Sequence, residues 1–336
     1  MRILVTGATG FVGGRYVERL QQSPPFQVRF CGRDKARGLA LAQAGGEFVA
    51  GDLTDINHAM RVCEGVDVVV HCAGLAGAWG DYDDYFRANV ASTWNLLQAC
   101  QIHGAKRFIF ISSPSIYFEP SDRLNITEQD LPKRLFDSYA RSKYEAEQYI
   151  YSVHSEHFTT AILRPRMVVG AGDTRILPQL IEARRSGLLR QVGRGKNQVS
   201  MTSINNLMDA IDACVKAPAE NLGEAFNIAD AEPVNLWSTI NYMLQQMDMP
   251  PVKRSVPYWL AYSVSHLVKW IKRFQQSDRE PRLLPLKVAI MAKSMTLNIE
   301  KAQHRLAYQP QQTTLEAIDE FIAWYKPQLL ANSETV

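Results

Sequence analysis

The sequence predicts an α/β protein built on a doubly wound parallel sheet, with a smaller mixed segment at its C-terminal side. Three observations predict this fold. Short apolar runs alternate with longer amphipathic stretches, the alternation stops near residue 165, and a glycine-rich turn follows the first apolar run. Strict strand–helix–strand alternation is typical of parallel strands with helices on both faces. A chain of 336 residues is long enough for one large domain or two ordinary ones.

The elements of the first part follow one another regularly. The expected strands are Arg2–Thr6, Gln27–Cys31, Glu47–Ala50, Asp67–His71, Arg107–Ser112 and Thr159–Arg164. The expected helices are Phe11–Gln21, Lys35–Ala44, Asp55–Cys63, Tyr82–His103 and Asp137–His154. Beyond them we expect helices at Ile204–Lys216 and Leu236–Met247 and a strand at Ala225–Ile228. The predicted division is a first domain at 1–165, a second segment at 166–330 and a frayed tail at 331–336.

Composition excludes several classes of protein. Lys and Arg number 37 against 34 Asp and Glu, and a net charge of +3 requires no nucleic-acid partner. The five cysteines are odd in number and form no C-x-x-C pair, which argues against a disulfide framework and predicts no metal site. No apolar run is long enough for a signal peptide at the N-terminus or for a membrane span elsewhere. A reducing, cytoplasmic location is the expectation.

The glycine-rich turn predicts a dinucleotide site and makes the fold Rossmann-type. Gly7, Gly10 and Gly13 allow, in turn, a tight turn, close approach of a pyrophosphate, and close packing of helix on strand. The N–H groups and the dipole of the following helix favour the phosphates. The predicted cofactor-binding residues here are Gly7, Thr9, Gly10, Phe11, Val12 and Gly13.

The ends of the next strands add to that site. Arg33, helped by Arg37, is placed to meet a 2′-phosphate, while Asp34 comes late for an NAD ribose, so NADP(H) is favoured and NAD(H) stays an alternative. Further along, ligands in such sheets bind at the carboxyl ends of strands. The residues predicted there are Asp52 and Leu53 at the adenine edge, and Cys72, Ala73 and Gly74 close to the cofactor.

A catalytic constellation follows the fifth strand. Tyr139 and Lys143 lie four residues apart, so they share one face of a helix. A nearby ammonium lowers the pKa of a phenol, and such a tyrosine can exchange a proton with an alcohol or a ketone while a hydride moves. The hydroxyl of Ser113 can hold the same oxygen. We therefore expect Ser113, Tyr139 and Lys143 to form the catalytic centre.

These motifs resemble those of the extended short-chain dehydrogenases/reductases. The stretch Thr6–Gly13 is similar to the family's TGxxGxxG, and Tyr139–Lys143 to its YxxxK. The resemblance implies the catalytic roles of Ser113, Tyr139 and Lys143, with the last two also contacting the cofactor. It also implies a catalytic role for Asn89 and a cofactor contact for Pro165. The family's habit of pairing through two long helices, here Tyr82–His103 and Asp137–His154, implies a homodimer.

Departures within the motifs narrow the branch. Dehydratases of this fold share an Asp–Glu pair directly after the catalytic hydroxyl residue, where this sequence has Pro114 and Ser115. Sugar-nucleotide epimerases typically have an asparagine where this sequence has Met167. Blocks of the second half resemble the 3β-hydroxysteroid dehydrogenase group, including sterol-4α-carboxylate 3-dehydrogenases and bacterial 2-alkyl-3-ketoalkanoate reductases. The resemblance implies an oxidoreductase for a bulky hydrophobic alcohol or ketone. A nucleotide-sugar epimerase and a non-catalytic NADP-sensing protein remain alternatives.

Two groups of residues are open to two interpretations each. Aromatic residues in the second half, with Trp79, line either an apolar pocket or a core: Trp237, Tyr258 and Trp259. Likewise, Arg164 or Arg166 meets either a substrate carboxylate or a structural partner.

The stretch Tyr258–Phe274 differs from the rest of the chain. Its apolar residues recur at helical spacing, and its surroundings from Lys253 to Arg282 are basic. The stretch predicts either a peripheral membrane contact or a helix that packs on the protein's own core.

Overall fold

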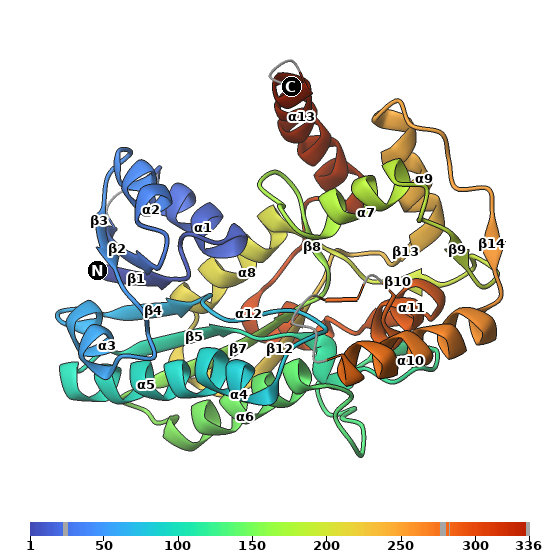
Figure 1. The fold of residues 1–336 in the computed structure, drawn as a ribbon. Helices are drawn as coiled ribbons and strands as arrows, with labels where there is room; N and C mark the ends of the chain where they lie inside the picture. The colour runs from blue at the N-terminus through green and yellow to red at the C-terminus, as the bar shows by residue number, and fades with distance from the viewer. Residues whose placement is uncertain (23–25, 276–279, 282, 334–336) are drawn as a thin grey trace.

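The main body of the protein is a seven-stranded parallel sheet between two layers of helices (Figure 1). The computed structural model describes residues 1–22, 26–275, 280–281 and 283–333. The strands lie in the order β12, β7, β5, β4, β1, β2, β3. They are β1 (Arg2–Thr6), β2 (Gln27–Gly32), β3 (Glu47–Ala50), β4 (Val68–His71), β5 (Arg107–Ile111), β7 (Thr159–Pro165) and β12 (Ala225–Ile228). The six strands expected before residue 165 are confirmed, each to within one residue.

The seventh strand comes from the second half of the chain. β12 pairs in parallel with β7, Ala225 opposite Ile162, and so extends the sheet at its edge. The helix before it, α8 (Ile204–Lys216), packs on the same core as the first strands. The large sheet and its cover therefore draw on residues beyond the expected division at 165.

Each face of the sheet has its own core. On one face, apolar residues of α1 and α8 such as Tyr16 and Leu207 pack on Val5 and Ile109. On the other face, residues of α3, α5 and α6 such as Leu97 pack on the opposite sides of the same strands. The helices of the first face are α1 (Phe11–Gln21), α2 (Lys35–Ala42), α8 and α12 (Glu300–Leu306), and those of the second are α3 (Ile56–Cys63), α5 (Ser92–His103) and α6 (Ser138–Val153). Strands buried on both faces explain the apolar runs of the sequence.

The long helix expected at Tyr82–His103 is continuous but not uniform. It consists of α4 (Tyr82–Tyr85), a π-helical segment (Phe86–Ala91) and α5. Such π segments are rare in proteins, and those that occur are often found at functional sites. This one carries Asn89, which its wider turn places within the protein interior.

The second unit is mixed, as predicted. A four-stranded sheet of β13 (Val234–Asn235), β10 (Gln198–Val199), β15 (Met295–Leu297) and β6 (Arg123–Ile126) lies beside two small pairs, β11 (Thr202–Ser203) with β8 (Val168–Val169) and β14 (Ser255–Val256) with β9 (Gln191–Val192). The helices are α7 (Ile176–Arg185), α9 (Leu236–Gln246), α10 (Tyr258–Phe274), α11 (Pro285–Ala292) and α13 (Thr314–Ser333), with 3₁₀ turns at Pro114–Tyr117 and Ala219–Asn221. α13 continues to Ser333, into the stretch expected as a tail, and residues 334–336 lie outside the described part.

Sheet order determines where a ligand binds. The chain runs outward from β1 through β2 and β3, then returns to β4 on the other side of β1. The loops after β1 and β4 therefore diverge, and in open α/β sheets the crevice between such loops holds the ligand. Among the described helices, none is long and apolar enough to cross a membrane.

Candidate active site

The glycine turn has the geometry of a phosphate cradle. Gly7 has a φ of +66°, and a Cβ added there would lie 2.6 Å from the backbone nitrogen of Ala73. A Cβ on Gly13 would lie 2.5 Å from the carbonyl oxygen of Gly7, so the helix packs on the turn only because that side chain is missing. At Gly10 the nearest atom would be 3.1 Å away and the residue is exposed, which leaves the turn open on its outer side.

The N-terminus of α1 is available for an anion. Its N-cap, Gly10, makes no side-chain hydrogen bond to the first turn, whereas Asp34, Asp55 and Asp137 cap α2, α3 and α6. The first N–H groups of a helix have no partner within the helix, so those of Phe11 and Val12 can bind a diphosphate. The residues of the turn thus fit the phosphates of a dinucleotide.

The end of β2 brings together the residues expected to select the cofactor. Arg33 is exposed and its Nη1 lies 3.9 Å from Asp52 Oδ2. Asp34 uses its carboxylate to accept the N–H of Arg37 at 2.9 Å as the cap of α2. Hydrogen bonds from the backbone and side chain of Thr54 hold the pKa of Asp52 below its usual range.

Other predicted cofactor residues line the same edge. The Thr9 side chain lies against Gly32, where an added Cβ would come 2.6 Å from Thr9 Oγ1. Leu53 is buried, and its carbonyl accepts a hydrogen bond from Asn95 at 3.0 Å. The Ala73 N–H donates to Thr6 Oγ1 at 3.2 Å and so fixes the loop after β4 to the end of β1.

Ser113 and Tyr139 lie close together. Ser113 follows β5 and Tyr139 is the second residue of α6, and the Ser113 hydroxyl lies near enough to the phenol to affect its pKa. The N–H of Ser115 donates to Ser113 Oγ at 3.2 Å, which orients this hydroxyl. Burial raises the pKa of the Tyr139 phenol, and the Ser113 hydroxyl partly offsets that rise.

Lys143 lies deeper than the tyrosine. Its Nζ donates to the Ile111 carbonyl at 2.9 Å and sits 4.3 Å from the centre of the Phe110 ring. Burial lowers the pKa of Lys143 to about 8, and the charge of Glu147 acts in the opposite direction. The predicted lowering of the Tyr139 pKa by Lys143 is not seen, because the phenol's net shift is upward and its own burial dominates.

Asn89 joins three elements around the lysine. Its Oδ1 accepts the Leu75 N–H at 2.7 Å, and its Nδ2 donates to the Leu75 carbonyl at 3.0 Å and to Ser142 Oγ at 2.8 Å. A Cβ added to Gly74 would lie 2.9 Å from Asn89 Oδ1 and 3.4 Å from Lys143 Nζ. The loop after β4, the π segment and α6 therefore converge at one point.

A buried ion pair, Glu147 with Arg164, lies next to the end of β5 and the catalytic helix α6. Glu147 accepts two hydrogen bonds from Arg164, Nη2 at 2.5 Å and Nε at 3.0 Å, and one from Ser112 Oγ at 2.5 Å. Arg164 also donates to the hydroxyl of Tyr117. Of the two interpretations weighed for Arg164, the structural ion pair is the one observed.

Sequence reasoning missed Glu147, although a signal was present. Tyr139, Lys143 and Glu147 follow one another at steps of four residues, so all three lie along one stripe of α6. It also passed over Ser115, whose buried Oγ has no hydrogen-bond partner among the described residues.

The remaining arginine and the aromatic residues lie in different environments. Arg166 is buried, and it donates to the Ser200 carbonyl at 2.8 Å and to Met167 Sδ at 3.2 Å. Trp237 belongs to the core, where its Nε1 donates to the Met291 carbonyl at 2.9 Å, and not to a pocket.

Comparison with known proteins agrees with this geometry. Residues 3–229 match the NAD dependent epimerase/dehydratase family. The chain belongs to that family. It is 32% identical to the uncharacterized protein YbjS of Escherichia coli (strain K12), over 97% of this chain and 98% of that protein. The chain is an oxidoreductase of the extended short-chain dehydrogenase/reductase type, and its family is NAD-dependent.

Two further relatives carry named activities. A 2-alkyl-3-oxoalkanoate reductase of Stenotrophomonas maltophilia (strain K279a) is 31% identical over 95% of this chain and 97% of that protein. A decarboxylating sterol-4-alpha-carboxylate 3-dehydrogenase of Mus musculus is 27% identical over 94% and 88%. The solved UDP-glucuronic acid 4-epimerase of Bacillus cereus, in complex with NAD, has a TM-score of 0.76 at 23% identity, covering 97% of this chain and 99% of that one. At 23% identity, the similarity to this epimerase shows a shared fold alone.

Proposed function

We propose that the protein interconverts a secondary alcohol and a ketone on a bulky hydrophobic substrate, either steroid-like or a long-chain 2-alkyl-3-keto acid. The observation that carries the proposal is the placement of the Ser113 hydroxyl near the Tyr139 phenol, with the buried Lys143 four residues further along the same helix. The two named relatives, a reductase of 2-alkyl-3-oxoalkanoates and a sterol-carboxylate dehydrogenase, support this class of substrate. Met167, in place of the asparagine typical of sugar-nucleotide epimerases, also supports it.

The residues have separate tasks in this reaction. A bound nicotinamide supplies or accepts the hydride. In the direction of reduction, Tyr139 gives its phenolic proton to the carbonyl oxygen while Ser113 donates a hydrogen bond to the same oxygen. Lys143 would bind the cofactor ribose, and Asn89 keeps the loop after β4 in place around it. In the opposite direction Tyr139 accepts the alcohol proton.

The proposal includes a preference for NADP(H). Arg33 is exposed at the end of β2, and the carboxylate of Asp34 is already engaged as a helix cap. An exposed guanidinium favours a 2′-phosphate, and the Asp34 carboxylate, which serves as a helix cap, is less available for the ribose hydroxyls. Replacing Arg33 by Ser should weaken NADPH binding at least tenfold and leave NADH binding unchanged, as measured by titration of nucleotide fluorescence. Equal affinities in both proteins would contradict this preference.

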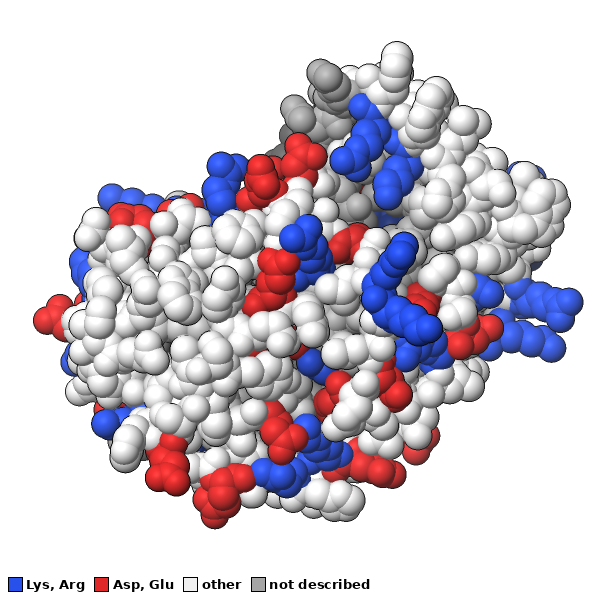
Figure 2. All heavy atoms as spheres, turned by 90° about the horizontal axis from the view of Figure 1, so that it is seen from below, with Lys and Arg blue, Asp and Glu red and all other residues white. Residues whose placement is uncertain are grey.

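A homodimer in the cytoplasm is the proposed state of the protein. The outer surface of α5 and α6 carries Trp94 and Tyr149, whose rings lie 5.0 Å apart, and Ile102, all partly or largely exposed. Figure 2 shows few charged side chains over the left part of the face on which these helices lie. Sedimentation should give twice the chain mass for the wild type and a lower mass for Trp94→Glu.

The decisive experiment measures turnover with defined substrates. Purified protein is mixed with NADPH or NADH and with a 2-alkyl-3-oxoalkanoate, a 3-ketosteroid or UDP-glucose, and oxidation of the nucleotide is followed by absorbance. Tyr139→Phe should lower kcat by about 10²–10⁴ while nucleotide binding persists. Tyr149→Phe, on the exposed side of the same helix, should retain wild-type turnover. Conversion of UDP-glucose without net nucleotide oxidation would favour an epimerase, and nucleotide binding without any turnover would favour a sensor.

A further inference from the structure

Helix α10 is amphipathic, but it exposes its apolar side to solvent. Of the apolar residues expected to share one face, Val268 is half-buried, and the others form a stripe that faces outward and is exposed: Leu260, Val264, Leu267, Ile271 and Phe274. The buried residues of the helix are the small Ala261 and Ser265 on the opposite side. An amphipathic helix of a globular protein normally buries its apolar stripe. The helix does pack on the protein's own core, through Tyr258, Ala261 and Tyr262, but most of its apolar stripe stays exposed.

The exposed apolar surface of α10 extends beyond the stripe to two tryptophans beside it. Phe274 is 82% exposed, Trp259 69% and Leu267 57%, and Trp270 lies beside Phe274 with its ring stacked at 6.1 Å. In Figure 2 a largely uncharged lobe projects at upper right, on the side where α10 lies in Figure 1. Exposed contiguous apolar surface of this kind marks an interaction site, and Trp is favoured at membrane–water interfaces.

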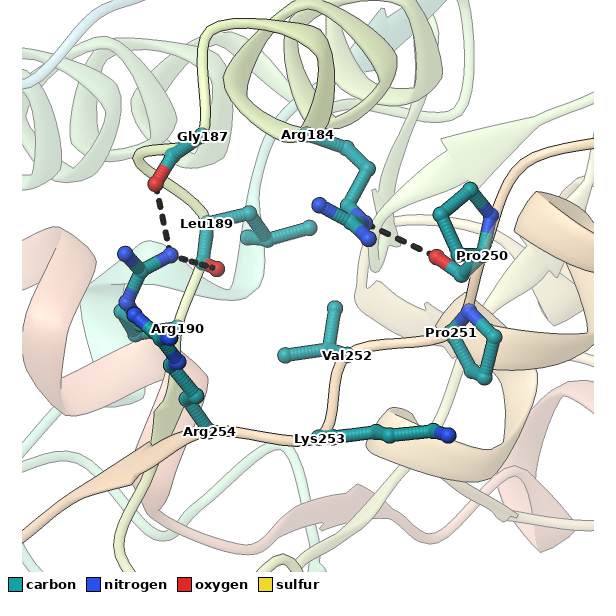
Figure 3. Close-up of a pocket in the computed structure, with 9 residues that line it drawn as sticks. All are labelled: Arg184, Gly187, Leu189, Arg190, Pro250, Pro251, Val252, Lys253 and Arg254. Atoms are coloured by element: carbon teal, nitrogen blue, oxygen red, sulfur yellow. Dashed lines mark hydrogen bonds between the residues drawn. The ribbon is translucent and has the colours of Figure 1, made fainter.

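The charges of α10 itself are of one sign. Lys269, Lys272 and Arg273 lie off the stripe on the same helix, and Tyr258–Phe274 contains no acidic residue. Just before the helix, Lys253 and Arg254 join Arg184 and Arg190 around a cavity of about 370 Å³ whose lining includes no carboxylate (Figure 3). None of these four cations forms an ion pair with a described carboxylate. Apolar residues with nearby cations suit a surface of anionic lipid.

The helix lies close to the catalytic centre. Its inner residues Tyr258 and Tyr262 share an apolar cluster with Phe136, which precedes Tyr139 by three positions in the chain. The charge of Lys269 is near enough to Asp137, the cap of the catalytic helix α6, to oppose the burial that raises the pKa of that carboxyl. A surface that binds through α10 would therefore lie near the start of α6, which carries Tyr139.

We propose that α10 docks the protein on an anionic lipid bilayer and that the hydrophobic substrate reaches the active site from that bilayer. The second part rests on the proposed function. A second copy of this chain is a poorer occupant, because Tyr258–Phe274 carries Lys269, Lys272 and Arg273 and no acidic residue, so two copies of the helix offer each other no charge complementarity.

Flotation with vesicles tests the docking without any turnover. The full chain should float with vesicles of phosphatidylcholine and phosphatidylglycerol, bind vesicles of phosphatidylcholine alone at least tenfold less, and lose binding as salt is added. Leu267→Glu/Phe274→Glu should reduce binding at least tenfold, and Leu39→Glu, an exposed leucine of α2, should leave it unchanged. Both substituted sites are on the surface, so circular dichroism and thermal unfolding should match the wild type.

Two results would overturn the docking. One is wild-type protein that floats with neither kind of vesicle. The other is a dimer that Leu267→Glu/Phe274→Glu converts to a monomer, since a second copy would then cover the stripe.

Kinetics with two probes test the delivery. A short-chain, water-soluble 3-oxo acid and a long-chain 2-alkyl homologue held in anionic vesicles are compared as substrates. Leu267→Glu/Phe274→Glu should raise KM at least fivefold for the vesicle-held probe and leave kcat and KM for the soluble probe unchanged. Equal KM values for the vesicle-held probe would refute delivery from the bilayer. If neither probe is turned over, the proposed function fails while flotation still decides the docking.

Discussion

Glu147 holds together the base of the active site, and removing its charge has a calculable cost. In Glu147→Gln, Arg164 keeps its guanidinium charge in a place where the two side chains are 0% and 3% exposed. Leaving one charge of a buried pair uncompensated destabilises a protein by about 3–5 kcal/mol. An unfolding entropy of about 2.1 cal/mol/K per residue gives about 0.7 kcal/mol/K for 336 residues. The expected fall in Tm is therefore about 4–7 °C.

Thermal unfolding followed by circular dichroism measures this change. The matched control is Asp84→Asn, which breaks the Arg87–Asp84 pair, 2.6 Å long but with both side chains exposed. Exposed pairs contribute at most about 1 kcal/mol, so its Tm should fall by less than about 1.5 °C. A double substitution, Glu147→Leu with Arg164→Met, should recover part of the loss because no charge stays buried. The reasoning is refuted if Glu147→Gln behaves like the surface control.

Three more predictions concern the same site. Gly13→Ala puts a Cβ 2.5 Å from the Gly7 carbonyl oxygen, so unfolding should become easier by about 1–3 kcal/mol and nucleotide affinity should fall more than tenfold by calorimetry. Without cofactor, an NMR titration of the Lys143 side chain should give a pKa near 8, and a value at the ordinary 10.5 would contradict the effect of its burial. Because the folded protein releases this proton at a lower pH than the unfolded chain, the free energy of unfolding should rise with pH between about 8 and 10.5. Asn89→Ala loses three hydrogen bonds, including that to Ser142, so chemical denaturation should show a loss of about 1–3 kcal/mol and kcat should fall.

The regular part of the fold was predictable because its signals are local. Apolar runs such as Val68–His71 have the length of a strand buried on both faces, and the glycines at 7, 10 and 13 lie between a strand and a helix. The closeness of Ser113 to Tyr139 was also within reach, since a strand end and a helix start in a parallel sheet share one edge. The π segment around Asn89 was not predictable, because nothing in its residue types separates it from ordinary helix.

The partners of the charged residues were less accessible. Arg164 and Arg166 look equivalent in the sequence, yet Arg164 meets Glu147 of α6 while Arg166 meets carbonyl and sulfur atoms of the second unit. Which of them finds a carboxylate depends on the order of strands and on which face each side chain takes. Both depend on contacts between residues far apart in the chain.

By itself the sequence determined the alternation of strands and helices, the phosphate turn and the stripe of Tyr139 and Lys143, because each depends on residues a few positions apart. Only the tertiary structure decided that Ala225–Ile228 completes the large sheet, that Glu147 neutralises Arg164, and that the apolar stripe of α10 faces outward. The periodicity of a helix fixes which residues share a face, but the neighbours against which the helix packs determine which face meets solvent.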